Sequence, residues 1–285
     1  MEPDTLTVPA GPGSLHVERY GQGGSAIVLL HGFGTSAFLW RNVAPLLAKG
    51  GRTVFAIDLL GYGASDRPLD AQWGVAAQAD HVAAALTSLG ITRALLVGND
   101  IGGNVALAIA ARWPERVDRL VLVNTVIGTD LQTAEIRSMQ RSTARLAIRL
   151  GRGVMGATPL LQPLLERSVA NKAHMPSRLV ARYLATYTGK EGTRHLLHLA
   201  RALREEAAPE VELSRIQTPT LLVWGDADLA IDAGMVDRAL AALPGARVTR
   251  LPGIGRLVPE EASDALASAI AEFAGAGTPP PGNAY

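Results

Sequence analysis

The sequence predicts an α/β protein, a mostly parallel sheet with helices on both faces and a helical insertion. Short, continuous apolar runs alternate with helical patterns over the first part of the chain. The alternation stops from about 126 to 210, where the pattern is helical throughout, and it resumes at 220–224. Strands that are apolar on both sides must be covered on both sides. The runs therefore indicate parallel strands joined by right-handed crossovers.

The elements can be placed in order along the chain. Residues 15–20 alternate between apolar and polar side chains, which is typical of an exposed antiparallel edge strand. Buried strands are expected at 26–30, 53–57, 94–97, 120–123, 220–224 and near 247–251. Helices are expected over 38–48, about 75–89, 102–113 and about 259–274.

The insertion and the end of the chain define the expected domain organisation. Apolar side chains between Ile136 and Leu150 recur at spacings of three and four, which indicates an amphipathic helix. We expect a core made of residues 1–125 and 211–274, and a helical lid over 126–210. Residues 275–285 are rich in glycine and proline and are expected to form a disordered tail.

The composition excludes several classes of protein. The 285 residues include 27 Lys+Arg, 26 Asp+Glu and no cysteine, so disulfides and cysteine-bound metals are excluded. No run approaches about 18 apolar residues. The first residues lack the pattern of a signal peptide, so we expect a cytoplasmic protein without a membrane span. Aromatic residues make up 5%, which argues against a surface that stacks on nucleic acid.

The near-neutral net charge is an average of two unlike parts. Residues 126–210 hold 13 Lys+Arg against seven Asp+Glu, whereas the remainder has an excess of acids. Four arginines recur at every fourth position, Arg137, Arg141, Arg145 and Arg149. They are interpreted either as a solvated helix face or as an attraction for anionic substrates or an acidic carrier protein. Docking on a membrane surface is a weaker alternative.

The segment around Asp100 is the most informative part of the chain. A strand runs into Gly98-x-Asp100-x-Gly102, and a helix begins at once. Small residues on both sides allow the strained turn called a nucleophile elbow, here with aspartate in the commoner place of serine. A carboxylate at a helix N-terminus stays ionised and can attack carbon or accept a proton. An ordinary helix N-cap is the alternative interpretation.

Four motifs in this order resemble the α/β-hydrolase superfamily: His31-Gly-Phe-Gly, Asp58-Leu-Leu-Gly-Tyr-Gly-Ala-Ser-Asp66, the Asp100 turn, and Trp224-Gly-Asp-Ala-Asp228. The arrangement is similar to the aspartate-nucleophile branch, the haloalkane dehalogenases and epoxide hydrolases. The segment from Thr35 to Arg41, which includes Trp40, is also dehalogenase-like. The resemblance implies an eight-stranded sheet with a helical lid between its sixth and seventh strands, and it implies no cofactor.

The resemblance also implies roles for individual residues. Asp100 would be the nucleophile, and the backbone N–H groups of Phe33 and Ile101 would form an oxyanion hole. Asp228 matches the acid of the family, although spacing alone does not exclude its neighbour Asp226. Dehalogenases typically place Trp after the nucleophile and often Asn after His-Gly, and this chain has Ile101 and Phe33 there.

The base histidine of the family is missing. It normally follows the last strand in a Gly-His pair, and here the pair is Gly255-Arg256. Arginine stays protonated and cannot act as a base, so hydrolysis of an ester formed on Asp100 should stall. An arginine near Asp100 is also expected to pair with it, lower its pKa and weaken its attack.

Two lid histidines are candidates for a substitute base. His195 and His198 lie three residues apart on a predicted helix over 191–203 and would face either the cleft or a packed or solvated side. No further histidine or carboxylate shares their spacing, so no metal site is expected. His31 belongs to the oxyanion loop and is expected to be structural.

The remaining pocket candidates are polar residues of the lid and core. Tyr183 and Tyr187 are spaced by four and would share one helix face, where they could protonate an epoxide oxygen or simply pack. Trp40 belongs to the dehalogenase-like segment. Asn124 stands where some relatives have an alternative acid, but an amide cannot serve as one.

Three hypotheses remain open at this stage. The first is a small-molecule enzyme that uses Asp100 without a hydrolytic base, such as an isomerase, lyase or cyclase. The second is a dehalogenase- or epoxide hydrolase-like enzyme with a base from elsewhere. The third is an inactive binding protein. The expected partner is a small molecule, anionic or carrier-bound. The sequence does not reveal the substrate or the oligomeric state.

Overall fold

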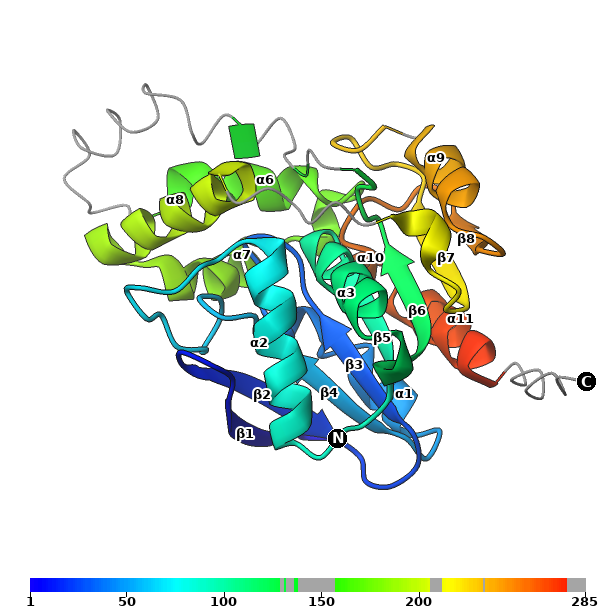
Figure 1. Cartoon of the computed structure of the whole chain (residues 1–285). Helices are drawn as coiled ribbons and strands as arrows, with labels where there is room; N and C mark the ends of the chain where they lie inside the picture. Colours follow the sequence, from blue (N-terminus) through cyan, green and yellow to red (C-terminus); the bar gives the residue numbers. More distant parts are fainter. Residues whose placement is uncertain (129–130, 132–135, 138–156, 206–211, 233, 276–285) are drawn as a thin grey trace, which may run out of the picture.

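One sheet of eight strands runs through the part of the chain that the computed structural model describes, residues 1–128, 131, 136–137, 157–205, 212–232 and 234–275 (Figure 1). The strands are β1 (Asp4–Pro9), β2 (Ser14–Tyr20), β3 (Ala26–Leu30), β4 (Thr53–Ile57), β5 (Ala94–Asn99), β6 (Val117–Val123), β7 (Thr220–Gly225) and β8 (Arg247–Leu251). Their order is β1-β2-β4-β3-β5-β6-β7-β8, and only the β1–β2 and β2–β4 pairs are antiparallel. The predicted eight-stranded, mostly parallel sheet is confirmed.

The edge of the sheet differs from the prediction. Strand β2 contains the residues expected at the edge, yet it pairs with β4 on one side and β1 on the other. The true edge is β1, in which Val8 alone is buried. An edge strand contacts the core along little of its surface, so β1 carries no apolar run that would reveal it.

Helices cover both faces of the sheet, as predicted (Figure 1). The described α-helices are α1 (Ala44–Ala48), α2 (Val75–Ser88), α3 (Ile101–Arg112), α6 (Thr158–Arg167), α7 (Ser177–Leu184), α8 (Gly189–Glu205), α9 (Gly234–Ala242), α10 (Val258–Glu261) and α11 (Ser263–Gly275). The 3₁₀ turns are η1 (Ala37–Trp40), η2 (Pro114–Arg116), η3 (Lys172–His174), η4 (Ala185–Tyr187) and η5 (Leu213–Arg215). Helix α2 packs against α3 on one face, and α1 packs against α11 on the other.

Two predicted helices are each interrupted. The segment expected to be one helix over 38–48 forms η1 and then α1, and Pro45 lies in the first turn of α1, the position where proline is tolerated. The final helix is split into α10 and α11 by Ala262, whose φ of −142° and ψ of 48° are not helical. Helix α9 was not predicted.

The helices between β6 and β7 lie over the carboxyl ends of the strands (Figure 1). The Arg67 side chain donates to the Thr186 carbonyl at 2.9 Å, and Leu257 N–H donates to the Ser168 carbonyl at 2.9 Å. Helix α6 contacts the loop after β3, since any side chain at Gly34 would overlap Leu161. In open α/β sheets this edge is where ligands bind.

Some predictions fall on residues outside the described part. Of the expected amphipathic helix, Ile136 is described and buried and Arg137 is described and exposed, and both are helical. Arg141, Arg145 and Arg149 lie outside the described residues, as do residues 276–285 of the expected tail. Within the described ranges, no helix is both long and apolar enough to cross a membrane.

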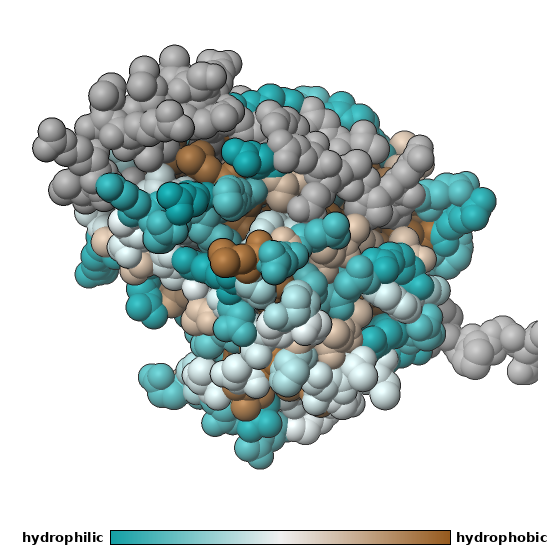
Figure 2. All heavy atoms as spheres, turned by 60° about the vertical axis from the view of Figure 1, so that its left-hand side comes forward, coloured by the Kyte–Doolittle hydropathy of each residue, from teal (hydrophilic) through white to brown (hydrophobic). Residues whose placement is uncertain are grey.

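Large apolar side chains are rare on the described surface. Those exposed are Met1, Leu69, Leu229 and Val248, which lie in separate parts of the chain. The face drawn in Figure 2 is mostly hydrophilic or neutral, with hydrophobic atoms in small, separate groups. Recognition on this face would therefore depend on charge and hydrogen bonding more than on a broad apolar contact.

Candidate active site

Asp100 occupies a sharp turn between β5 and α3. Its φ of 53° and ψ of −123° fall in a region that non-glycine residues rarely adopt, and the residue is 7% exposed. A side chain at Gly98 would overlap the backbone of Gly102 and Gly103, and one at Gly102 would overlap the carbonyl of Leu30. The two glycines are thus required by the turn, and the arrangement is the elbow that the sequence predicts.

We expect the variant Gly102→Ala to unfold more easily than the wild type by about 3 kcal/mol or more, because backbone atoms cannot move aside as side chains can. Chemical denaturation monitored by circular dichroism measures the difference. Gly275→Ala is the matched control, since a Cβ at Gly275, the last residue of α11, meets open space. Equal stability of the two variants would contradict the tight turn.

The Asp100 carboxylate lies against the backbone amides that were predicted to form an oxyanion hole. Phe33 N–H donates to Asp100 Oδ2 at 3.0 Å. Burial raises the pKa of Asp100, the Asp228 charge raises it further, and the amides of Phe33 and Ile101 with the positive charge of Arg256 lower it. The net shift is upward. In this state the Phe33 amide orients the carboxylate of Asp100 itself.

His31 is buried and bonded to the backbone through both ring nitrogens. Its Nε2 accepts a hydrogen bond from Leu59 N–H at 3.0 Å, so Nδ1 carries the proton and donates to the Gly32 carbonyl at 2.8 Å. Burial lowers the pKa of His31, and the ring is neutral. Both nitrogens are engaged, which leaves this histidine unable to act as a base.

Tyr62 was missed by the sequence analysis. Its buried ring contacts His31 and Phe33 edge-on, with ring centroids 5.1 and 6.3 Å apart. Burial raises the pKa of Tyr62 well above its usual value, and the charges of Tyr187 and Asp100 raise it further. The residue therefore supports the loop after β3 and lies within electrostatic reach of Asp100. Its place in the Gly61-Tyr-Gly63 sequence was the available signal.

Asp228 and Asn124 form one hydrogen-bonded unit at the ends of β7 and β6. Asn124 Nδ2 donates to Asp228 Oδ2 at 3.0 Å, and Asn124 Oδ1 accepts from Gly225 N–H at 2.8 Å. The charge of Asp228 acts on Asp100. Asp226 instead pairs with Arg250 at 2.8 Å on the surface. Of the two aspartates left open by the sequence, Asp228 is therefore the one near Asp100, and Asp226 lies on the surface.

Arg256 is buried, with 3% of its surface exposed. Its Nη2 donates to Ser168 Oγ at 2.7 Å, and its carbonyl accepts from Asn99 Nδ2 at 3.0 Å. The expected direct pair with Asp100 is not formed: among the described residues, no hydrogen bond or ion pair joins them. The expected low pKa of Asp100 is also wrong, because burial outweighs the charge of Arg256.

The two lid tyrosines do not share a helix face. Helix α7 ends at Leu184 and the chain tightens into η4, so the spacing of four is not α-helical. Tyr183 Oη donates to Glu260 Oε1, and Glu260 also binds Arg41 through two contacts of 2.7 Å. Tyr183 therefore ties the insertion to the core.

The buried polar atoms that lack a hydrogen-bond partner among the described residues include the Tyr187 hydroxyl and Trp40 Nε1. Both residues are almost completely buried. Tyr187 thus stays a candidate for contact with a bound molecule, whereas Tyr183 is already committed to Glu260. Glu260 was not identified from the sequence, since its partners are distant along the chain.

Neither lid histidine is brought to Asp100. His195 Nε2 lies 2.6 Å from the Gly61 carbonyl, and its ring contacts Trp73 edge-on. Burial lowers the pKa of His195. His198 is exposed on the other side of α8 from the buried residues. His195 is therefore packed and His198 is solvated, the two alternatives to facing the cleft. Among the described residues, no group of His, Asp and Glu is arranged to hold a metal.

Comparisons with known proteins agree with the fold. A family profile described as "alpha/beta hydrolase fold" matches residues 25–263. Haloalkane dehalogenase 2 of Mycobacterium tuberculosis is 30% identical over 275 residues, 91% of each chain. The 2-hydroxymuconate semialdehyde hydrolase of Pseudomonas sp. strain CF600 is 47% identical over 105 residues, which are 36% of this chain and 37% of that protein. Crystalline Cfl2 of Burkholderia cenocepacia superimposes with a TM-score of 0.81 at 28% identity over 95% of each chain.

Proposed function

The chain belongs to the α/β-hydrolase family, and from that premise we propose that it transforms a small organic molecule through Asp100 without a histidine base. The proposed core is residues 1–125 and 211–274, and residues 126–210 act as a lid over the substrate. The substrate is anionic or carrier-bound. The proposed chemistry is non-hydrolytic, of the isomerase, lyase or cyclase type.

One observation carries the proposal: the arginine that follows β8, where the resemblance leads us to expect the base histidine, is buried. Arg256 follows β8, its charge acts on Asp100, and it is anchored to Ser168. His31 is fully engaged in backbone hydrogen bonds, and His195 is bound to Gly61. Neither of these two histidines is therefore placed to activate water against an ester on Asp100.

The raised pKa of Asp100 supports a role in proton transfer. The Phe33 amide holds Oδ2, which leaves Oδ1 to accept a proton from a carbon next to a carbonyl group. The electron pair moves into the carbonyl, and Arg256 stabilises the negative oxygen. The proton then returns from Asp100 to another carbon, so the substrate is isomerised and the enzyme is restored. Departure of a leaving group, which takes the proton from Asp100, instead gives elimination and restores the carboxylate.

A second candidate is favoured by the relatives. The 30% identical protein is named a haloalkane dehalogenase. In that reaction Asp100 Oδ1 would attack carbon, the halide would leave, and an alkyl ester would form. Arg256 is charged and the two histidines are engaged, so the ester on Asp100 would not be hydrolysed. Each protein molecule would then react only once.

An isotope experiment distinguishes these reactions. The protein is incubated with haloalkanes, epoxides, esters and enolisable carbonyl compounds, in deuterium oxide and in heavy-oxygen water. We expect deuterium in recovered substrate or product, without heavy oxygen and without a protein adduct. An adduct on Asp100 found by intact mass supports the single-turnover dehalogenase. Repeated incorporation of heavy oxygen into product would refute non-hydrolytic chemistry.

A further inference from the structure

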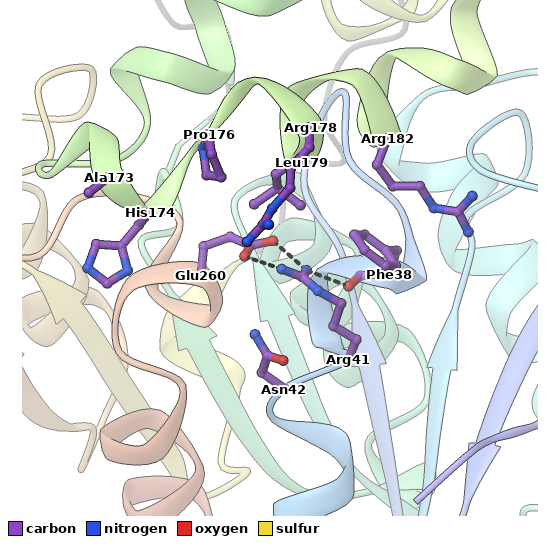
Figure 3. A pocket seen from close by; sticks show the side chains of 10 residues that line it. All are labelled: Phe38, Arg41, Asn42, Ala173, His174, Pro176, Arg178, Leu179, Arg182 and Glu260. Atoms are coloured by element: carbon purple, nitrogen blue, oxygen red, sulfur yellow. Dashed lines mark hydrogen bonds and ion pairs between the residues drawn. The ribbon is translucent and has the colours of Figure 1, made fainter.

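A hollow of about 500 Å³ lies between the insertion and the core, and its lining does not include Asp100, Asp228 or Arg256 (Figure 3). Helix α7 and turn η3 form one side, while η1 and the end of α10 form the other. Because these elements are far apart in the sequence, no sequence motif indicates the hollow.

Two arginines of α7 line the hollow. Arg178 and Arg182 are spaced by four, one helical turn, and both are exposed. Figure 3 shows Arg178 extending from α7 toward Glu260, whereas Arg182 extends to the other side, over the Phe38 ring, with its guanidinium carbon 5.1 Å from the ring centre. Neither arginine makes a hydrogen bond or ion pair with another described residue. Their donors are open to a ligand.

The acid in the hollow does not neutralise these two charges. Glu260 Oε1 accepts from Arg41 and Tyr183, and Glu260 Oε2 accepts from Arg41. The charge of Glu260 is thus matched by Arg41, which is held over the Phe38 ring at 4.1 Å. The hollow keeps the positive charge of Arg178 and Arg182.

This arrangement is unfavourable without a counter-charge. Like charges spaced by four on a helix repel, and Arg178 lies in the first turn of α7, where the helix dipole disfavours a cation. Both side chains are exposed and can turn toward one oxyanion, which removes both penalties and gains charge-assisted hydrogen bonds. The apolar surfaces of Phe38, Pro176 and Leu179 stand beside it and suit a small organic body.

We propose that this hollow binds a small organic anion, a carboxylate or phosphate monoester with an apolar body, held by Arg178 and Arg182. The site is separate from Asp100, so it does not depend on the function proposed above. Its ligand is recognised by the oxyanion through the arginines and by the apolar body through Phe38 and Leu179.

Calorimetric titration with four probes tests the proposal. We expect saturable binding of phenyl phosphate and benzoate, weaker binding of inorganic phosphate and none of phenol, and binding that weakens as salt is added. If inorganic phosphate binds as tightly as phenyl phosphate, the apolar body has no role and the proposed ligand class is wrong. Absence of saturable binding by both organic anions would overturn the site itself.

Variants assign the binding to the arginines. In the double variant Arg178→Gln/Arg182→Gln, the affinity for phenyl phosphate should fall about tenfold or more. Arg194→Gln removes an exposed arginine of α8 that pairs with Glu191, and it should change nothing. Asp100→Asn should also leave binding unchanged. Binding that survives the double variant, or that is lost in Arg256→Gln instead, would place the anion elsewhere and refute the proposal.

Discussion

Replacing Asp100 with asparagine is expected to reduce turnover about a thousandfold or more, while the protein stays folded. The amide has nearly the size of the carboxylate, and its oxygen can still accept the Phe33 N–H that now binds Oδ2. It cannot attack carbon or accept a proton. Steady-state rates on a substrate found in the isotope experiment measure the loss.

Asp226→Asn is the matched control for this variant. Asp226 lies near the same end of β7 as Asp228, but it is exposed and pairs with Arg250. Its replacement should leave turnover close to that of the wild type. Retained activity in Asp100→Asn would remove the carboxylate from the reaction and favour a binding protein.

The variant Asp100→Asn should also be more stable than the wild type at neutral pH. Burial raises the pKa of Asp100 above its usual 3.8, so the folded state binds a proton more readily than the unfolded state. Ionisation therefore costs folding free energy as pH rises from the usual pKa through the raised one. Asparagine carries no such penalty. The stability advantage should disappear at acid pH, where Asp100 is protonated, and urea unfolding across pH measures it.

The sequence was sufficient to predict the ends of the strands that form the site. Asp100, Asn124, Asp228 and Arg256 follow β5, β6, β7 and β8, which are successive neighbours in the parallel sheet. Parallel strands bring their carboxyl ends to one edge, so a correct strand order places these four residues together. The sequence motifs revealed these positions because the turns that follow the strands need particular residues at fixed spacings.

The partners of those residues could not be predicted in the same way. Ser168 reaches Arg256 from the insertion, and Tyr183 reaches Glu260 from α7. Such contacts depend on how the helices pack over the sheet. This packing leaves no repeating pattern in the sequence. The pKa of Asp100 illustrates the consequence: the sequence shows the charge of Arg256 but not the burial that outweighs it.

Replacing Arg256 with histidine is expected to create hydrolytic turnover. The backbone at this position is held by Asn99, which binds the carbonyl, and by the neighbouring Leu257 N–H on Ser168. A histidine here would extend toward Asp100. Among the described residues, Asp228 Oδ2 is bound only by Asn124, so it can accept a further hydrogen bond from the ring of that histidine. It would activate water against an ester on Asp100.

The comparison that decides this is between Arg256→His and Arg256→Gln, with a reactive haloalkane as substrate. Both variants remove the positive charge, so both should form the Asp100 ester, which intact mass detects. Only the histidine variant should release alcohol repeatedly, about a hundredfold or more faster than the glutamine variant. Glutamine has no basic nitrogen. If both variants release alcohol at the same rate, the increase over the wild type therefore comes from the loss of the positive charge. The absence of a base would then not be what limits this chain.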